Sequence, residues 1–159
     1  MSMAGKPKRS STTLIGIAGV HYVVSELSRR GVIALPTVKN TAAYDIVAMN
    51  VEGTRHANIQ VKTSGKRASF FPMPDANDVR SGPHDYYVFV RWLKEEQRFE
   101  GFLLKGREAK KAVQETIRWQ KRKIAEGTRE TIFPAAYVEG DKGLKGPAWH
   151  KAWERWMMK

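Results

Sequence analysis

The 159-residue sequence predicts an α/β fold in which a mixed sheet of about four or five strands lies between helices, with a helical extension at the C-terminus. Three observations predict it. Apolar residues recur at helical spacing from residue 12 onward, residues 44–64 alternate like a β-hairpin, and two further strand patterns within 85–104 precede a second helical pattern at 107–125. A chain of this length without internal repeats suits one core domain.

The N-terminal region divides into a polar arm and a helix. Residues 1–11 are small, polar and basic, which predicts a flexible arm that contacts phosphate. The alternative is that these residues were left by an expression tag. A helix is predicted from Thr12 or Thr13, and Gly31, after two arginines, marks its end. Its expected inner positions follow i, i+3, i+7 and i+10: Ile17, Val20, Val24 and Leu27.

The hairpin brings polar side chains together. If Glu52 and Gly53 form a two-residue turn, Asp45 lies opposite Gln60 in the cross-strand register. Alternation along the second strand places Gln60 and Lys62 on the same face. We therefore expect an acid, an amide and an ammonium to converge there.

The second half continues with loops, strands and helices. Residues 63–83 are expected to be a long loop, 85–93 and 98–104 strands joined by a turn, and 107–125 a helix with Val113, Ile117 and Ile124 inside. A break at 133–147 precedes a short helix that begins at Pro147. Its apolar face includes three tryptophans at helical spacing, which favours packing on the core over base stacking: Trp149, Trp153 and Trp156.

These patterns divide the chain into three parts. We expect the flexible basic arm at residues 1–11, the core domain at 12–126, and the C-terminal extension with its tryptophan-rich helix at 127–159.

Charge is the most informative global property. The chain has 28 Lys and Arg against 16 Asp and Glu, a net charge of +12, and residues 105–129 alone hold nine bases and three acids. This balance favours a polyanionic partner such as nucleic acid. The chain has no cysteine, which excludes disulfides and thiol catalysis. No stretch has the length and apolarity of a membrane span or secretory signal, so we expect a cytoplasmic protein.

Three segments resemble a known superfamily. "GVHYVVSELSRRG" at 19–31, "AAYDIVAMN" at 42–50 and "NIQVKTS" at 58–64 are similar to the first helix and the motif strands of the PD-(D/E)XK nucleases. The resemblance is to the resolvase-like or homing-endonuclease-like branch with a D…QxK motif. It covers Leu14 to Thr63 well and the later strands loosely. It implies a restriction-endonuclease-like fold with a core of αβββαβ type.

The resemblance also implies chemistry. Asp45, the Gln60 side-chain oxygen and the Val61 carbonyl would hold Mg²⁺ or Mn²⁺, while Lys62 would orient or help deprotonate water and offset charge on the phosphate. The implied activity is DNA endonuclease, for which double-strand cutting would call for a homodimer. In many members a glutamate occupies the position of Val20, and an acid that of Gln60.

The residues of the motif also allow other interpretations. Asp45 could brace its strand, Gln60 could be a neutral cross-strand partner, and Lys62 could extend to solvent. The missing acid at Val20 favours a catalytically weak or inactive nucleic-acid-binding module on the same fold. A basic protein-interaction domain is a third reading.

Several residues outside the motif are candidates for nucleic-acid contact. Phe70 and Phe71 stand in a basic loop, where they contact nucleic acid or anchor the loop, and the 107–125 helix carries a run of bases or simply a solvated face. The contact candidates are Lys66, Arg67, Phe70, Lys121, Arg122 and Lys123. The histidines at 21, 56, 84 and 150 lack the spacing of zinc ligands.

Overall fold

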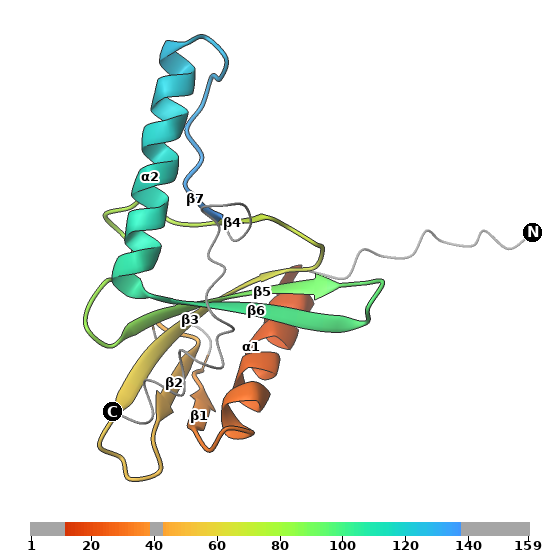
Figure 1. Ribbon diagram of the computed structural model, residues 1–159. Helices are drawn as coiled ribbons and strands as arrows, with labels where there is room; N and C mark the ends of the chain where they lie inside the picture. Colours follow the sequence, from red (N-terminus) through yellow and green to blue (C-terminus); the bar gives the residue numbers. More distant parts are fainter. Residues whose placement is uncertain (1–11, 39–42, 138–159) are drawn as a thin grey trace, which may run out of the picture.

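The computed structural model describes residues 12–38 and 43–137, which form a mixed α/β fold (Figure 1). A five-stranded mixed sheet in the order β1-β2-β3-β5-β6 is flanked by two helices, which confirms the predicted α/β class with a mixed sheet between helices. The implied αβββαβ order of elements is corrected, because no helix separates β3 from β5 in residues 65–84. The elements in chain order are α1 Thr12–Ser28, β1 Ile33–Pro36, β2 Ile46–Met49, β3 His56–Ser64, β4 Phe70–Pro72, β5 Asp85–Leu93, β6 Arg98–Lys105, α2 Gly106–Ala125 and β7 Ala135–Tyr137. The predicted N-terminal arm and the tryptophan-rich helix lie outside the described residues.

The sheet is antiparallel except at its centre. Strands β1, β2 and β3 form an antiparallel meander, β5 and β6 a hairpin, and β3 runs parallel to β5. The connection from β3 to β5, residues 65–84, contains no helix but includes the short strand β4, which pairs with β7. The expectation of an uninterrupted loop over residues 63–83 is therefore corrected, and residues 135–137 of the expected break are strand.

Each face of the sheet has its own core cluster. Helix α1 covers one face, where Ile59 and Val61 of β3 are buried with Val23 and Leu27 of the helix. Helix α2 and the segment around β4 cover part of the other face, against Tyr87 and Phe89 of β5. The two clusters use alternate residues of the same strands, as the pleat requires.

The inner stripe of α1 differs from the predicted one. Gly19, Val23 and Leu27 are buried, whereas Ile17 is 42% exposed and its assignment to the inner stripe was wrong. Gly19 sits at the closest approach of the helix to β3, since a Cβ there would lie 2.0 Å from the Thr63 hydroxyl oxygen. The absence of a side chain lets helix and sheet meet.

The hairpin has the predicted register but another turn. Strands β2 and β3 pair Val47 with Asn58 and Ile46 with Ile59, the alignment expected from sequence. The turn is closed by the buried Asn50, whose side chain accepts a hydrogen bond from the Arg55 backbone N–H at 2.8 Å. Residues 50–55 therefore connect the strands in place of a two-residue turn, with Asn50 and Arg55 hydrogen-bonded across the base of the loop, and the alignment is preserved because the loop is symmetric about the same centre.

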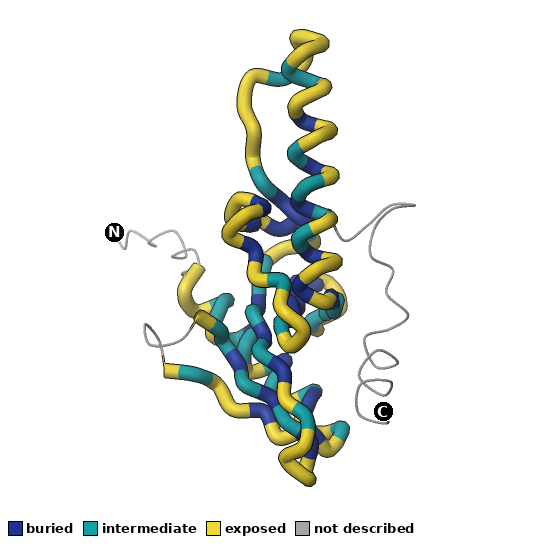
Figure 2. The backbone as a smooth tube through the Cα atoms, turned by 90° about the vertical axis from the view of Figure 1, so that its left-hand side faces the viewer, coloured by how far each residue is buried: buried dark blue, intermediate teal, exposed yellow. Residues whose placement is uncertain are grey.

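Helix α2 extends beyond the sheet with a returning segment at its side. Figures 1 and 2 show this α2 projection, made of α2 and residues 126–134, standing away from the sheet with a largely exposed far end. Gln120 joins its two limbs: its amide donates to the Phe133 carbonyl at 2.7 Å and accepts from the Phe133 N–H at 2.6 Å. The predicted inner residue Val113 is buried, with Ile117 and Ile124 half-buried. No helix in the described part of the chain is long and apolar enough to cross a membrane.

Candidate functional site

Asp45 and Gln60 meet where β2 begins. The Gln60 amide donates a hydrogen bond to the Asp45 carboxylate at 2.5 Å, and the Val61 backbone N–H donates to the same carboxylate oxygen at 2.7 Å. Asp45 stands one residue before β2, where its own N–H donates to the Ile59 carbonyl at 2.9 Å. The carboxylate is therefore held by two donors of β3, in a half-buried position.

The backbone of Val61 contributes to the same edge. A strand residue directs its N–H and its carbonyl to the same side, and the Val61 N–H points at Asp45. The Val61 carbonyl consequently faces the region beside the Asp45 carboxylate, past the last paired residue of β2. The strand therefore directs a main-chain oxygen to the side of β3 on which Asp45 lies.

Lys62 shares a sheet face with Gln60. In the parallel register Gln60 aligns with Tyr87 and Lys62 with Phe89, so both lie on the face opposite α1. Lys62 is half-buried, and within residues 12–38 and 43–137 no hydrogen bond or ion pair engages its ammonium. The structure thus brings Asp45 into contact with Gln60 and places Lys62 on the same strand face, one pleat further on.

The oxygen donors of this site fit a hard divalent cation. The second carboxylate oxygen of Asp45 and the side-chain amide oxygen of Gln60 make no hydrogen bond with a described residue. With the Val61 carbonyl they make three oxygen donors and one negative charge, which matches a cation such as Mg²⁺ that keeps several waters. In the described ranges no three His, Asp or Glu side chains gather in the manner of a metal centre. The donors named here are instead one carboxylate, one side-chain amide oxygen and one backbone carbonyl oxygen.

Val20 does not face this site. Its half-buried side chain packs against the core cluster under α1, while Gln60 and Lys62 lie on the other face of β3. The neighbouring Glu26 pairs with Arg29 and Arg30 at 3.3 and 2.9 Å. Helix α1 therefore brings no carboxylate to Asp45.

Tyr44 and Arg80 form a neighbouring contact that the sequence did not suggest. Arg80 donates to the Tyr44 hydroxyl at 3.1 Å, and its guanidinium lies 4.9 Å from the centre of that ring. The Arg80 backbone N–H donates to the Tyr87 hydroxyl, whose pKa burial raises. Tyr44 precedes Asp45 directly, so this contact involves the residue next to the candidate site. Only the fold joins positions 36 residues apart, which is why no sequence pattern indicated it.

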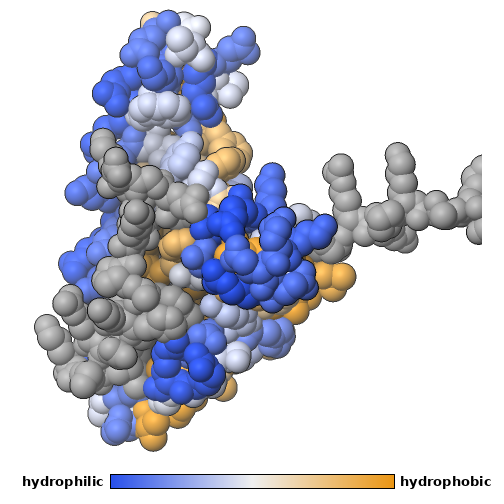
Figure 3. Space-filling model, turned by 45° about the vertical axis from the view of Figure 1, so that its right-hand side comes forward, coloured by the Kyte–Doolittle hydropathy of each residue, from blue (hydrophilic) through white to orange (hydrophobic). Residues whose placement is uncertain are grey.

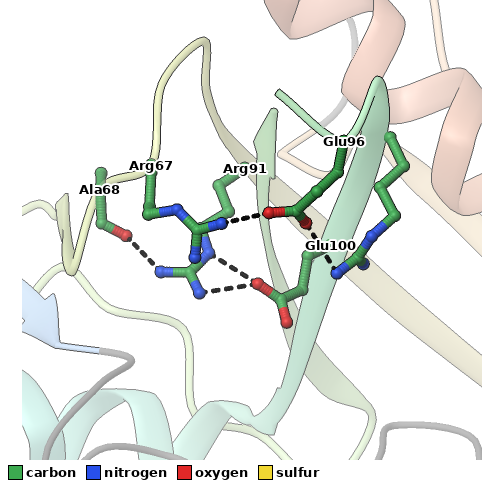
Figure 4. Close-up of polar contacts among 6 residues, drawn as sticks. Arg67, Ala68, Arg91, Glu96 and Glu100 are labelled. Carbon is green, nitrogen blue, oxygen red and sulfur yellow. Dashed lines mark hydrogen bonds and ion pairs between the residues drawn. The ribbon is translucent and has the colours of Figure 1, made fainter. Parts of the chain in front are cut away.

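The basic loop after β3 is tied down by ion pairs (Figure 4). Arg91, 3% exposed, binds Glu100 through two nitrogens at 2.7 and 2.8 Å and donates to the Ala68 carbonyl at 3.1 Å. Arg67 pairs with Glu96. The Arg67 charge is thereby partly neutralised, whereas Lys66 is exposed at the head of the loop.

Among the aromatic and helical candidates for nucleic-acid contact, some side chains are exposed and others are buried or ion-paired. Phe71 is 1% exposed and belongs to the core, while Phe70 is 42% exposed and contacts the rings of Phe133 and Tyr137. On α2, Lys121 and Arg122 are exposed, but Lys123 pairs with Glu126 at 2.6 Å. Lys121 and Arg122 are therefore the better placed of the three for an external anion.

His56 and His84 form a pair away from the candidate site. His56 and His84 stack with ring centres 4.1 Å apart, beside an open pocket that Arg55 and Tyr86 help to line. His56 stands four residues before Gln60 on β3, which is about 13 Å along a strand. His21 is exposed on α1. His150 lies outside the described residues.

Comparison with known proteins finds likeness among solved structures only. No family model matches the chain, and no curated protein matches it. Among solved structures, the chain is similar to that of a bacterial homing endonuclease, I-Ssp6803I, with a TM-score of 0.49 and 14% sequence identity over 94% of each chain. A likeness of this size assigns neither a family nor an activity, so we base the function on the residues of this chain.

Proposed function

We propose that the protein is a metal-dependent DNA endonuclease of the PD-(D/E)XK type, with Asp45, Gln60 and Lys62 at its catalytic site. The observation that carries the proposal is the contact of Asp45 with Gln60 and the Val61 N–H, with Lys62 on the same strand face. A plain structural hairpin does not need an acid, an amide and an ammonium that no described residue pairs with, all near one end of a strand. The net charge of +12 supports a nucleic-acid substrate.

The residues have distinct roles in this proposal. Asp45, the Gln60 side-chain oxygen and the Val61 carbonyl hold Mg²⁺ or Mn²⁺, which when bound supplies charge neutralisation and an activated water at the phosphate. Gln60 also orients Asp45, because its amide hydrogen bond fixes one carboxylate oxygen. Lys62 positions the attacking water and offsets negative charge that develops on the phosphate.

Cleavage of plasmid DNA tests the proposal. We expect the purified protein to nick or cut supercoiled and linear DNA in Mg²⁺ or Mn²⁺, and Lys62→Ala to lower the rate by roughly 10²-fold or more while DNA binding persists. Asp45→Asn keeps an oxygen for the Val61 N–H and should also abolish cleavage. Lys94→Ala, at the exposed turn between β5 and β6, is the matched control and should cleave normally. Metal-dependent cleavage that persists in both Lys62→Ala and Asp45→Asn would contradict the assignment of the catalytic site.

A non-catalytic nucleic-acid-binding module is the second candidate. It is favoured by the single carboxylate of the site and by the position of Val20 in the core on the far side of β3. Salt-sensitive binding without cleavage of duplex, branched and single-stranded DNA would establish it. Failure to bind any nucleic acid at low salt would favour a protein-interaction domain.

Double-strand cutting by one site per chain would require two copies. We propose a homodimer on DNA for that reason alone. Analytical ultracentrifugation with and without duplex DNA would test it, and a monomer that cuts both strands would contradict it.

A further inference from the structure

The basic residues of α2 fall on one side of the helix. At about 100° per residue, six of them lie within a sector of about 120° that begins beside the buried stripe and ends opposite it. We call this the cationic flank, and its members are Arg107, Lys110, Lys111, Arg118, Lys121 and Arg122. Five of the six are exposed and Lys110 is half-buried.

The two acids of α2, Glu108 and Glu115, lie outside the cationic flank, and Glu108 and the capping residue Glu126 are engaged locally. Glu108 accepts a hydrogen bond from the Lys105 N–H at 2.8 Å, and Glu126 pairs with Lys123 at 2.6 Å. Lys123 itself is on the other side of the helix. Of the run Lys121-Arg122-Lys123, only the first two residues therefore belong to the cationic flank. They lie on the same side of α2 as the four flank residues that precede them in the chain.

Within residues 12–38 and 43–137, no ion pair neutralises the cationic flank. Across the described residues, none of its six side chains is in a hydrogen bond or an ion pair. Six like charges on one helix repel each other. The far end of α2 stands away from the sheet (Figure 1) and its surface is mostly hydrophilic (Figure 3). Such an arrangement is stabilised by an external polyanion.

We propose that the cationic flank of α2 binds the sugar-phosphate backbone of DNA and holds the duplex while the candidate site acts. From Arg107 to Arg122 the helix rises about 22 Å, a length over which duplex DNA carries roughly 13 phosphates. A row of cations thus meets a row of anions. A membrane surface fits less well, because the apolar stripe of α2, Ala109 and Val113, is buried in the core. The choice of DNA as partner rests on the proposed function.

Binding of a fluorescent 30-base-pair duplex in EDTA tests the inference without any cleavage. The triple variant Lys111→Gln, Arg118→Gln, Arg122→Gln should bind on the order of 100-fold more weakly at 100 mM salt and lower the slope of log Kd against log salt by about 2 to 3. The control Lys94→Gln, Arg98→Gln, Lys105→Gln removes the same charge at exposed bases outside the cationic flank. Its slope should change by less than about 1.

The outcomes separate this inference from the proposed function. A triple variant that binds DNA like the control, or wild-type protein that does not bind DNA, would overturn the inference. Equal displacement of the duplex by polyglutamate at the same charge concentration would overturn DNA as the partner. Flank-dependent binding by a protein that never cleaves in Mg²⁺ would support the inference and overturn the proposed endonuclease.

Discussion

Gly19 is a position where one added methyl group should destabilise the fold measurably. A Cβ built there lies 2.0, 2.8 and 2.9 Å from the Oγ1, Cγ2 and Cβ atoms of Thr63. Rotation of Thr63 moves the first two atoms, but its Cβ stays in place, so α1 or β3 must shift. Overpacking of this kind costs about 1–3 kcal/mol. Gly19→Ala should therefore lower the free energy of unfolding by about that amount, although alanine is the better helix former.

Gly16 supplies a control three residues earlier in the same helix. A Cβ at Gly16 meets nothing within 4 Å. Gly16→Ala should stabilise the protein by about 0.4–1 kcal/mol, through the helix preference and the smaller entropy of the unfolded chain. The pair of variants changes the same atoms in the same secondary structure, so propensity cancels between them.

Urea unfolding of the two variants measures the difference. We expect the midpoints to move in opposite directions from wild type, with the m-value unchanged. The double variant Gly19→Ala, Thr63→Ala should regain part of the loss, because two of the three close atoms are gone. Gly19→Ala as stable as Gly16→Ala would refute the close approach of α1 to β3.

Two further predictions concern the α2 projection and the acid range. Gln120→Ala leaves the Phe133 N–H and carbonyl without their partner, so unfolding free energy should fall by about 1–3 kcal/mol and hydrogen exchange near Phe133 should rise, whereas an unchanged exchange rate would contradict the clamp. Partial burial raises the pKa of Glu26, but hydrogen bonds from Arg30 and Arg29 outweigh it and leave that pKa below its ordinary value. The stability from Glu26 is therefore present above the ordinary value and lost as pH falls through the lowered one, so wild type should lose more stability than Glu26→Gln between pH 6 and about 3. Parallel pH curves for the two proteins would oppose this account.

The central strands were predictable because their signals are local. Alternation over residues 46–64 and the position of the turn fixed the hairpin alignment, even though Asn50 closes a longer turn than expected. The approach of Asp45 to Gln60 followed directly from that alignment. The apolar run of β5 was equally clear, since all but two of its residues are buried.

The features that the sequence did not predict depend on tertiary contacts or on very short strands. Strands β4 and β7 have three residues each and one includes Pro72, so they carry no periodic signal. The inner stripe of α2 includes Gln120, which is buried because a backbone segment lies across it. The contact of Arg80 with Tyr44 joins a loop to the start of β2. None of these is encoded by spacing along the chain.

The location of a bound divalent ion tests the central claim most directly. Crystals grown or soaked with Mn²⁺ can be measured at a wavelength where manganese scatters anomalously. We predict a peak at bonding distance from the Asp45 carboxylate and the Val61 carbonyl, with Gln60 beside it, and its loss in Asp45→Asn. Manganese bound elsewhere in a protein that cleaves DNA, with Asp45 still held only by β3, would contradict the account.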